Sequence, residues 1–133
     1  MLREARVGRL ATADARGRPL VVPVCFVLEG DALYSAVDAK PKRDPARPLR
    51  RIRNVEENPQ AALVVDEYDE DWRRLRYVIV EGETTILTGG PDFAHAVDRL
   101  REKYPQYLDL GLPRERGTVI RLAIARLLCW KFA

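Results

Sequence analysis

The residues best suited to chemistry in this sequence are the basic side chains between Lys40 and Arg53. This segment, KPKRDPARPLRRIR, contains seven Lys or Arg residues and one acid, Asp44. A guanidinium presents a planar fork of donors that fits the oxygens of a phosphate, and several cations converging on one dianion can bind it together. The segment therefore predicts an anion site, with a solvated, arginine-rich surface as the alternative.

Three kinds of anion suit such a segment: a nucleic-acid backbone, a membrane surface or a single phosphate group of a cofactor. The chain has 23 basic and 20 acidic residues and a net charge of +3, which is too balanced for a strong nucleic-acid signature. The expected strands also lack the paired aromatic residues of RNA-binding sheets. No run approaches the ~20 apolar residues of a membrane span. We therefore expect neither nucleic acid nor membrane as a partner.

Other catalytic arrangements find little support in the sequence. His95, the only histidine, lies in an expected amphipathic helix and is interpreted as a structural or surface residue. The glycine-rich phosphate loops G-x-x-x-x-G-K-[ST] and G-x-G-x-x-G do not occur. Paired acids such as Glu56 and Glu57 are interpreted as solvated faces rather than as a hydrolase site. With one histidine and no paired cysteine spacing, no metal site is expected.

Length and composition favour a single soluble domain over residues 1–133, with 47% hydrophobic and 32% charged residues. Two cysteines, Cys25 and Cys129, and an N-terminus without an apolar signal segment favour a reducing cytoplasm. Of the 23 basic residues, 19 are Arg and 4 are Lys. Because most arginine codons are GC-rich, this balance points to a GC-rich genome such as that of an actinobacterium.

Alternation and turn residues predict the elements that position the basic segment. The first three strands, expected as an antiparallel meander, lie at 7–13, 18–28 and 32–37. Pro23 falls inside the second strand, and because proline cannot donate to a ladder this point should be an edge, a bulge or a ligand-facing break. The basic segment should be a loop as far as Pro48, followed by a short helix over 49–57 that ends at Asn58.

The second half of the chain completes a mainly β pattern. Further strands are expected at 60–68, 77–87 and 118–132, with a helix as the alternative for the last. Apolar residues at spacings of three or four predict an amphipathic helix from Pro91 to about Tyr104, followed by an irregular stretch to 117. About six antiparallel strands and two helices, without βαβ alternation, predict a small antiparallel β-barrel with flanking helices.

The order of these segments resembles the pyridoxamine-phosphate-oxidase-like split β-barrel superfamily. The motifs that carry the resemblance are VGRLAT, RPLVVPVCFV, YSAVDAKPKR, LRRIRNVEENP and DEYDEDW. The motifs look like those of a subgroup of probable F420-dependent oxidoreductases found in actinobacteria, and the resemblance as a whole covers the chain from about Val7 to Trp130. The resemblance implies an FMN-binding-like split β-barrel with two or three helices. Relatives usually have a longer N-terminal helix, whereas here only MLREA precedes the first expected strand.

The resemblance also implies which residues contact a cofactor. The basic residues that would bind its phosphate are Lys42, Arg50, Arg51 and Arg53. The strand that would flank the isoalloxazine or deazaflavin ring supplies Val22, Pro23, Val24 and Cys25. A second ring-contacting stretch would supply Val37 and Asp38. Trp72 is expected to close the site across a dimer interface, with packing in the core or the interface as the alternative, and no catalytic side chain is assigned.

The activity implied by the resemblance is hydride transfer between reduced F420 and a small organic acceptor. The cofactor would lie in a groove between the protomers of a homodimer. In such enzymes the cofactor carries the redox chemistry, while the protein supplies binding, orientation and exclusion of water. The alternatives are an oxidase or reductase of the same fold that uses FMN, and a protein that binds flavin or F420 without turnover.

Overall fold

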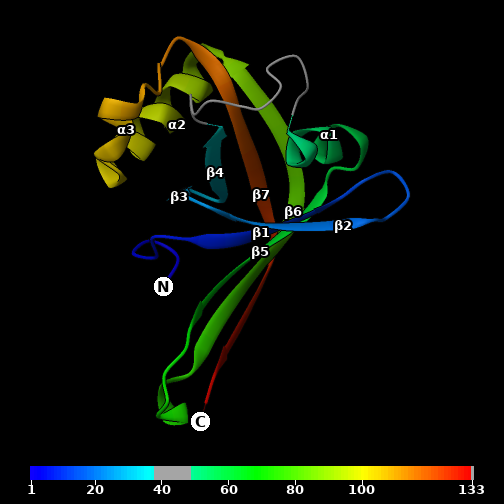
Figure 1. Ribbon diagram of the computed structural model, residues 1–133, viewed down its shortest axis with the longest axis vertical. Coiled ribbons are helices and arrows are strands. Elements are labelled where there is room, and N and C mark those ends of the chain that lie inside the picture. Colours follow the sequence, from blue (N-terminus) through cyan, green and yellow to red (C-terminus); the bar gives the residue numbers. More distant parts are fainter. Residues whose placement is uncertain (38–48, 133) are drawn as a thin grey trace.

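The computed structural model describes residues 1–37 and 49–132 (Figure 1). Within them, seven strands form one antiparallel sheet in the order β2-β1-β5-β6-β7-β4-β3. The strands are β1 (Gly8–Ala13), β2 (Pro19–Val24), β3 (Val27–Glu29), β4 (Ala32–Val37), β5 (Gln60–Glu67), β6 (Arg76–Gly89) and β7 (Arg116–Lys131). The helices are α1 (Arg50–Glu57), the 3-10 turn η1 (Trp72–Arg74), α2 (Gly90–Lys103) and α3 (Gln106–Leu110). None of the helices in these residues has the length and apolar character needed to span a bilayer.

The sheet closes into a barrel because its two edge strands are consecutive in the chain. β2 and β3 lie at opposite ends of the strand order, yet only Cys25 and Phe26 separate them. In a flat sheet, six inter-strand steps would hold these edges roughly 29 Å apart. The chain from Val24 to Val27 reaches about 11 Å at most. The sheet must therefore curl until its edges meet, and the join between β2 and β3 is the seam of a split barrel.

The seam is held by the end of helix α2. Phe26 is 0% exposed, and its amide donates to the Tyr104 hydroxyl at 3.1 Å. Its carbonyl oxygen accepts from Lys103 Nζ at 2.9 Å, and Nζ also lies 4.3 Å from the centre of the Phe26 ring. Burial raises the pKa of the Tyr104 hydroxyl and lowers the pKa of the Lys103 ammonium. Both side chains thus satisfy backbone groups that no neighbouring strand reaches.

Two long strands, β6 and β7, pass through the whole molecule and bend at a bulge. Their register shifts between Glu81 and Gly82. A Cβ built on Gly82 would lie 1.7 Å from the carbonyl oxygen of Ala123, so only glycine allows the two backbones to approach this closely. On one side of the bulge β7 pairs with β4, and on the other β6 pairs with β5. The far end of that second part projects from the barrel as an arm that ends at η1 and at the end of β7 (Figure 1).

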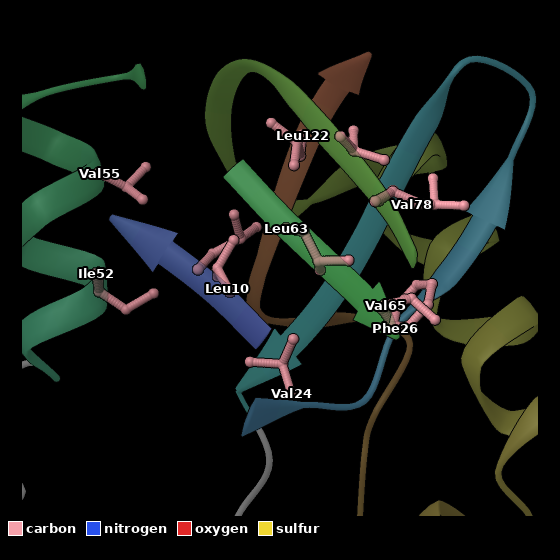
Figure 2. Packing of buried hydrophobic residues seen from close by; sticks show 12 residues of the cluster. Leu10, Val24, Phe26, Ile52, Val55, Leu63, Val65, Val78 and Leu122 are labelled. Carbon is pink, nitrogen blue, oxygen red and sulfur yellow. The ribbon is translucent and has the colours of Figure 1, made fainter. Parts of the chain in front are cut away.

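The apolar side chains form two cores on either side of the sheet. The barrel interior contains residues from six strands and α1, including Leu10, Leu63 and Val78 (Figure 2). The second core packs α2 and α3 against β3, β4 and β7, with Phe93 and Leu100 fully buried. Helices α2 and α3 lie together on one side of the barrel and α1 lies on the other (Figure 1). Helix α1 is therefore tied to the barrel interior through Ile52 and Val55.

The predicted split β-barrel is confirmed, and the described residues form seven strands rather than about six. The expected meander over 7–37 is wrong: the apolar run at 18–28 divides into β2 and β3, which pair with β1 and β4 and lie at opposite edges. The physical reason is that Phe26 turns into the core and its backbone bonds to helix α2. Pro23 lies on the edge strand β2, as its missing N–H predicted.

The boundaries of the other elements follow the sequence closely. The helix expected over 49–57 is α1, and the strand expected over 118–132 is β7, rather than the helix left open as an alternative. The stretch expected to be irregular contains a five-residue helix, α3, whose Tyr107 is buried. Five residues are too few to show the apolar periodicity of a helix, so α3 could not be predicted from the sequence and is identified by its packing against α2.

Replacing Tyr104 by Phe tests the seam. The change leaves the Phe26 amide buried without its acceptor, so the free energy of unfolding should fall by about 1–3 kcal/mol. Urea denaturation measures this loss. Tyr68→Phe, at an exposed tyrosine of the arm, is the matched control and should change stability by less than about 0.5 kcal/mol. Equal stability of both variants would show that the barrel does not depend on the seam.

Candidate functional site

Helix α1 carries three of the predicted phosphate-binding residues. Its apolar face, with Ile52 and Val55, is buried against the barrel. At about 100° per residue, Arg50 and Arg53 lie on the same outward flank of the helix, whereas Arg51 lies about 160° around the axis from Arg53. The structure therefore brings Arg50 and Arg53 together and turns Arg51 to another side.

Arg50 and Arg53 line a hollow of about 370 Å³ between α1 and the β1–β2 hairpin. The remaining lining residues are Asp14, Arg18, Asn54 and Glu57. Arg18 comes from the hairpin, so cations from two separate segments meet here. Within residues 1–37 and 49–132, the buried Nε of Arg53 has no hydrogen-bond partner.

The hairpin is fixed to helix α1 by side-chain hydrogen bonds. Asn54 Nδ2 donates to Thr12 Oγ1 at 3.1 Å, and both residues are buried. The Ala15 amide donates to Glu57 Oε2 at 3.0 Å, and Asn58 Nδ2 donates to the Asp14 carbonyl oxygen at 3.4 Å. These bonds hold the two walls of the hollow at a fixed separation.

Asp14 organises the hairpin turn itself. Its Oδ1 accepts from the amides of Arg16 and Arg18, each at 2.9 Å, and its Oδ2 accepts from Arg18 Nε at 2.6 Å. The Arg18 amide, followed by the Arg18 guanidinium, lowers the pKa of the Asp14 carboxyl. The carboxylate of Asp14 thus accepts hydrogen bonds from the turn, and the carboxylate of Glu57 accepts one from a backbone amide. Both carboxylates that line the hollow therefore already have hydrogen-bond donors.

The predicted ring-contacting residues lie mostly on the edge strand β2. Pro23 and Cys25 are exposed, Val22 is half-buried, and Val24 points into the core with 7% exposure. Val37, half-buried, is the last residue of β4. The predicted residues Asp38 and Lys42 lie outside the described residues. An alternating strand of this kind can present only its outward side chains and its backbone to a ligand.

Trp72 is the first residue of η1, at the end of the arm. Its side chain is 61% exposed, which excludes packing in the core of its own protomer. Nearby on the arm, Tyr77 and Trp130 stack with ring centroids 5.4 Å apart, and both are exposed. An exposed group of aromatic side chains is typical of an interaction surface.

Sequence reasoning missed the residues that complete the hollow. Asp14 lies in the turn between the first two expected strands and Arg18 begins the second of them, although the D-x-R-G-R pattern places a carboxylate and two arginines within five residues. Asn54 and Glu57 follow Arg50 at helical spacings of four and seven, which puts all three on one flank. That periodicity was visible in the sequence, but the pairing of this flank with the hairpin depends on the tertiary fold.

Comparison with known proteins identifies the family of this chain. A family profile described as pyridoxamine 5'-phosphate oxidase matches residues 1–131. The chain therefore belongs to the pyridoxamine 5'-phosphate oxidase family, whose split β-barrel fold it shares.

Individual relatives are similar over most of the chain. A 5a,11a-dehydrotetracycline/5a,11a-dehydrooxytetracycline reductase from Streptomyces rimosus subsp. rimosus is 34% identical over 108 residues, covering 79% of this chain and 73% of the reductase. The crystal structure of HutZ, a heme storage protein from Vibrio cholerae, is similar with a TM-score of 0.73 and 20% identity, over 94% of this chain and 86% of HutZ. An FAD-binding protein from Mesorhizobium loti has a TM-score of 0.71 and 24% identity, over 95% and 86% of the two chains. The two structural similarities establish the fold.

The Asp14 turn predicts a pH dependence of stability. Because the pKa of Asp14 is lowered on folding from its ordinary value of 3.8, its contribution is present above that pH and is lost as the pH falls through the folded-state pKa. Asp14→Asn should therefore flatten the acid-side fall in the free energy of unfolding relative to the wild type. Denaturant unfolding between about pH 5 and pH 2 measures this slope.

Asp31→Asn, at a side chain that is 93% exposed, makes the same change in charge and is the matched control. It should retain the wild-type slope. If Asp14→Asn also retains that slope, the turn does not stabilise the hairpin.

Proposed function

We propose that this protein is an oxidoreductase that binds a flavin-type cofactor and transfers a hydride between that cofactor and a small organic acceptor. The observation that carries the proposal is the 34% identity to a reductase over 79% of the chain. The split barrel, a fold shared with an FAD-binding protein, agrees with this assignment. When bound, the cofactor supplies the redox chemistry, so the residues of this chain need to bind it, orient it and exclude water.

The residues of α1 fit the phosphate of such a cofactor. Arg50 and Arg51 stand in the first turn of the helix, where the positive end of the helix dipole favours an anion. The forked donors of arginine suit the oxygens of a phosphate, and α1 has no acidic residue in its first turn to compete. We assign the binding of the cofactor phosphate to Arg50 and Arg51. Arg53, about one helical turn after Arg50, and Lys42, on the preceding segment, are further candidates for contacts to this phosphate.

We propose F420 as the cofactor, with FMN as the runner-up. F420 carries a phosphodiester and a glutamate tail, so a basic rim favours it electrostatically. The arginine-rich composition and the Streptomyces relative support an actinobacterial setting, in which F420 is an expected cofactor. FMN shares a phosphate and a tricyclic ring, so the same arginines would serve either molecule.

We further propose that two protomers form the complete site. The arm exposes Trp72, Tyr77, Trp130 and further apolar residues, a composition typical of the centre of an interface. Covering this surface with a second copy would stabilise the arm through burial of apolar area. In this arrangement Trp72 would close the cofactor groove of the partner, and two exposed residues, Pro23 of β2 and Cys25 just after that strand, would face the ring.

Fluorescence titration with F420, and in parallel with FMN, tests the cofactor assignment. The wild type should bind F420 more tightly than FMN. Arg51→Ala should weaken binding of the cofactor about 10- to 100-fold, because it removes a charge-assisted contact worth roughly 1.5–3 kcal/mol. Arg116→Ala, at an exposed arginine at the start of β7, is the matched control and should bind as the wild type does.

The possible outcomes separate the alternatives. Tight binding of FMN alone would make the protein a flavin enzyme, and binding of neither cofactor would contradict the proposal. Binding without reduction of any acceptor by the reduced cofactor would favour a binding protein without turnover.

Multi-angle light scattering tests the dimer. The wild type should have about twice the 15.2 kDa mass of one chain. Trp72→Ala should raise the dimer dissociation constant about 30-fold or more, as expected for loss of a central aromatic residue worth roughly 2 kcal/mol. Leu108→Ala, at an apolar side chain on α3 that is 66% exposed, is the control and should leave the mass unchanged. A monomer that binds the cofactor would rule out the shared groove.

A further inference from the structure

The hollow between helix α1 and the β1–β2 hairpin has more basic than acidic side chains in its lining, and the cofactor assignment leaves one of the basic residues, Arg18, without a role. Three arginines line it, Arg18, Arg50 and Arg53, against the two carboxylates of Asp14 and Glu57. We infer that this hollow, which we call the hairpin hollow, is a second anion site that binds a phosphate-type oxyanion through Arg18 and Arg53.

The first reason is the state of Arg53. Its Nε is buried, and no group in residues 1–37 and 49–132 accepts a hydrogen bond from it. A buried donor of a charged group is destabilising when it has no acceptor, so such groups usually have a bound water or ion as partner. An oxyanion in the hairpin hollow would supply both the missing acceptor and the opposite charge.

The second reason is that the acids of the hairpin hollow are already engaged. Asp14 accepts three hydrogen bonds from Arg16 and Arg18, and Glu57 accepts one from the Ala15 amide. Arg18 donates to Asp14 through its Nε, and within the described ranges, 1–37 and 49–132, its terminal nitrogens have no acceptor. Among the residues that the structure describes, Arg50 donates a long bond of 3.4 Å to the Pro19 carbonyl oxygen and no other. The available donors are therefore guanidinium groups, which select an oxyanion rather than a cation.

The third reason is that the walls are held in place. The Thr12–Asn54 and Ala15–Glu57 bonds connect the hairpin to α1 on the side of the helix that carries Arg53. A site with fixed walls loses less conformational entropy when it binds a ligand than a mobile surface does. At about 370 Å³, the hollow accommodates a phosphate group together with part of the molecule that carries it.

Isothermal titration of inorganic phosphate at constant ionic strength, with chloride as the reference anion, tests the inference. The wild type should bind phosphate in preference to chloride. Arg18→Met and Arg53→Met should each weaken phosphate binding about 10- to 100-fold, as expected for loss of one charge-assisted contact. Arg16→Met changes the same hairpin at an arginine that does not line the hollow, so it should bind phosphate as the wild type does.

A further variant separates this site from the cofactor assignment. Arg51→Met removes the proposed contact to the cofactor phosphate but lies outside the hairpin hollow, so it should retain phosphate binding there. Wild-type affinity in both Arg18→Met and Arg53→Met would overturn the inference, whatever the result with F420 or FMN. Loss of phosphate binding in Arg51→Met alone would overturn it as well.

Two additional measurements keep the test decisive. Arg53→Lys retains the charge but not the fork, so it should bind phosphate with an affinity between those of the wild type and Arg53→Met, even if Arg53→Met unfolds. Repeating the titration with the cofactor bound distinguishes the source of the anion. Competition would identify it as an acidic group of the cofactor, and undiminished binding would identify it as a separate phosphate-bearing molecule.

Discussion

The constraint on which the rest of the structure depends is the two-residue connection between the opposite edges of the sheet. Because Cys25 and Phe26 join β2 to β3, the sheet has to close, and the closure leaves the backbone of Phe26 without a strand partner. Helix α2 supplies the missing bonds through Lys103 and Tyr104. The helix after β6 is therefore part of the barrel's closure as well as the cover of its second core.

Closure at the seam also determines which side chains and backbone groups on the outside of the barrel are available to bind a ligand. With β2 at an edge, its outward side chains and backbone remain available, and its hairpin with β1 projects toward α1. The bonds from Thr12, Ala15 and Asp14 to α1 then fix the distance between arginines from two segments. Helix α1 therefore has two roles: Ile52 and Val55 on one face pack in the core, and the arginines on its other faces are available to bind anions.

Much of this fold follows from the sequence in physical terms. Alternation over 60–67 and 76–89 and the helical spacing over 90–103 give these elements directly, since each pattern extends over eight residues or more. The division of the apolar run at 18–28 into β2 and β3 could not be predicted, because the run is continuous in the sequence and the break at Phe26 depends on Tyr104, 78 residues later. The bulge at Gly82 likewise depends on the approach of Ala123 from another strand.

The candidate site was predictable only in part, for the same reason. Arg50, Arg51 and Arg53 are apparent as a basic run, but their division between two sides of α1 follows from the buried face of the helix. Arg18 was out of reach of sequence reasoning because its role depends on the hairpin lying against α1. Local signals thus identified the helix, and tertiary contacts identified its neighbours.

The most direct measurement is a crystal structure of the protein with F420 bound. The phosphate should lie at the first turn of α1 in contact with Arg50 and Arg51, and the ring should lie against β2, near Pro23, with an arm of a second protomer over it. A cofactor bound away from α1 and β2, or bound by a single protomer with its arm uncovered, would contradict the proposed site.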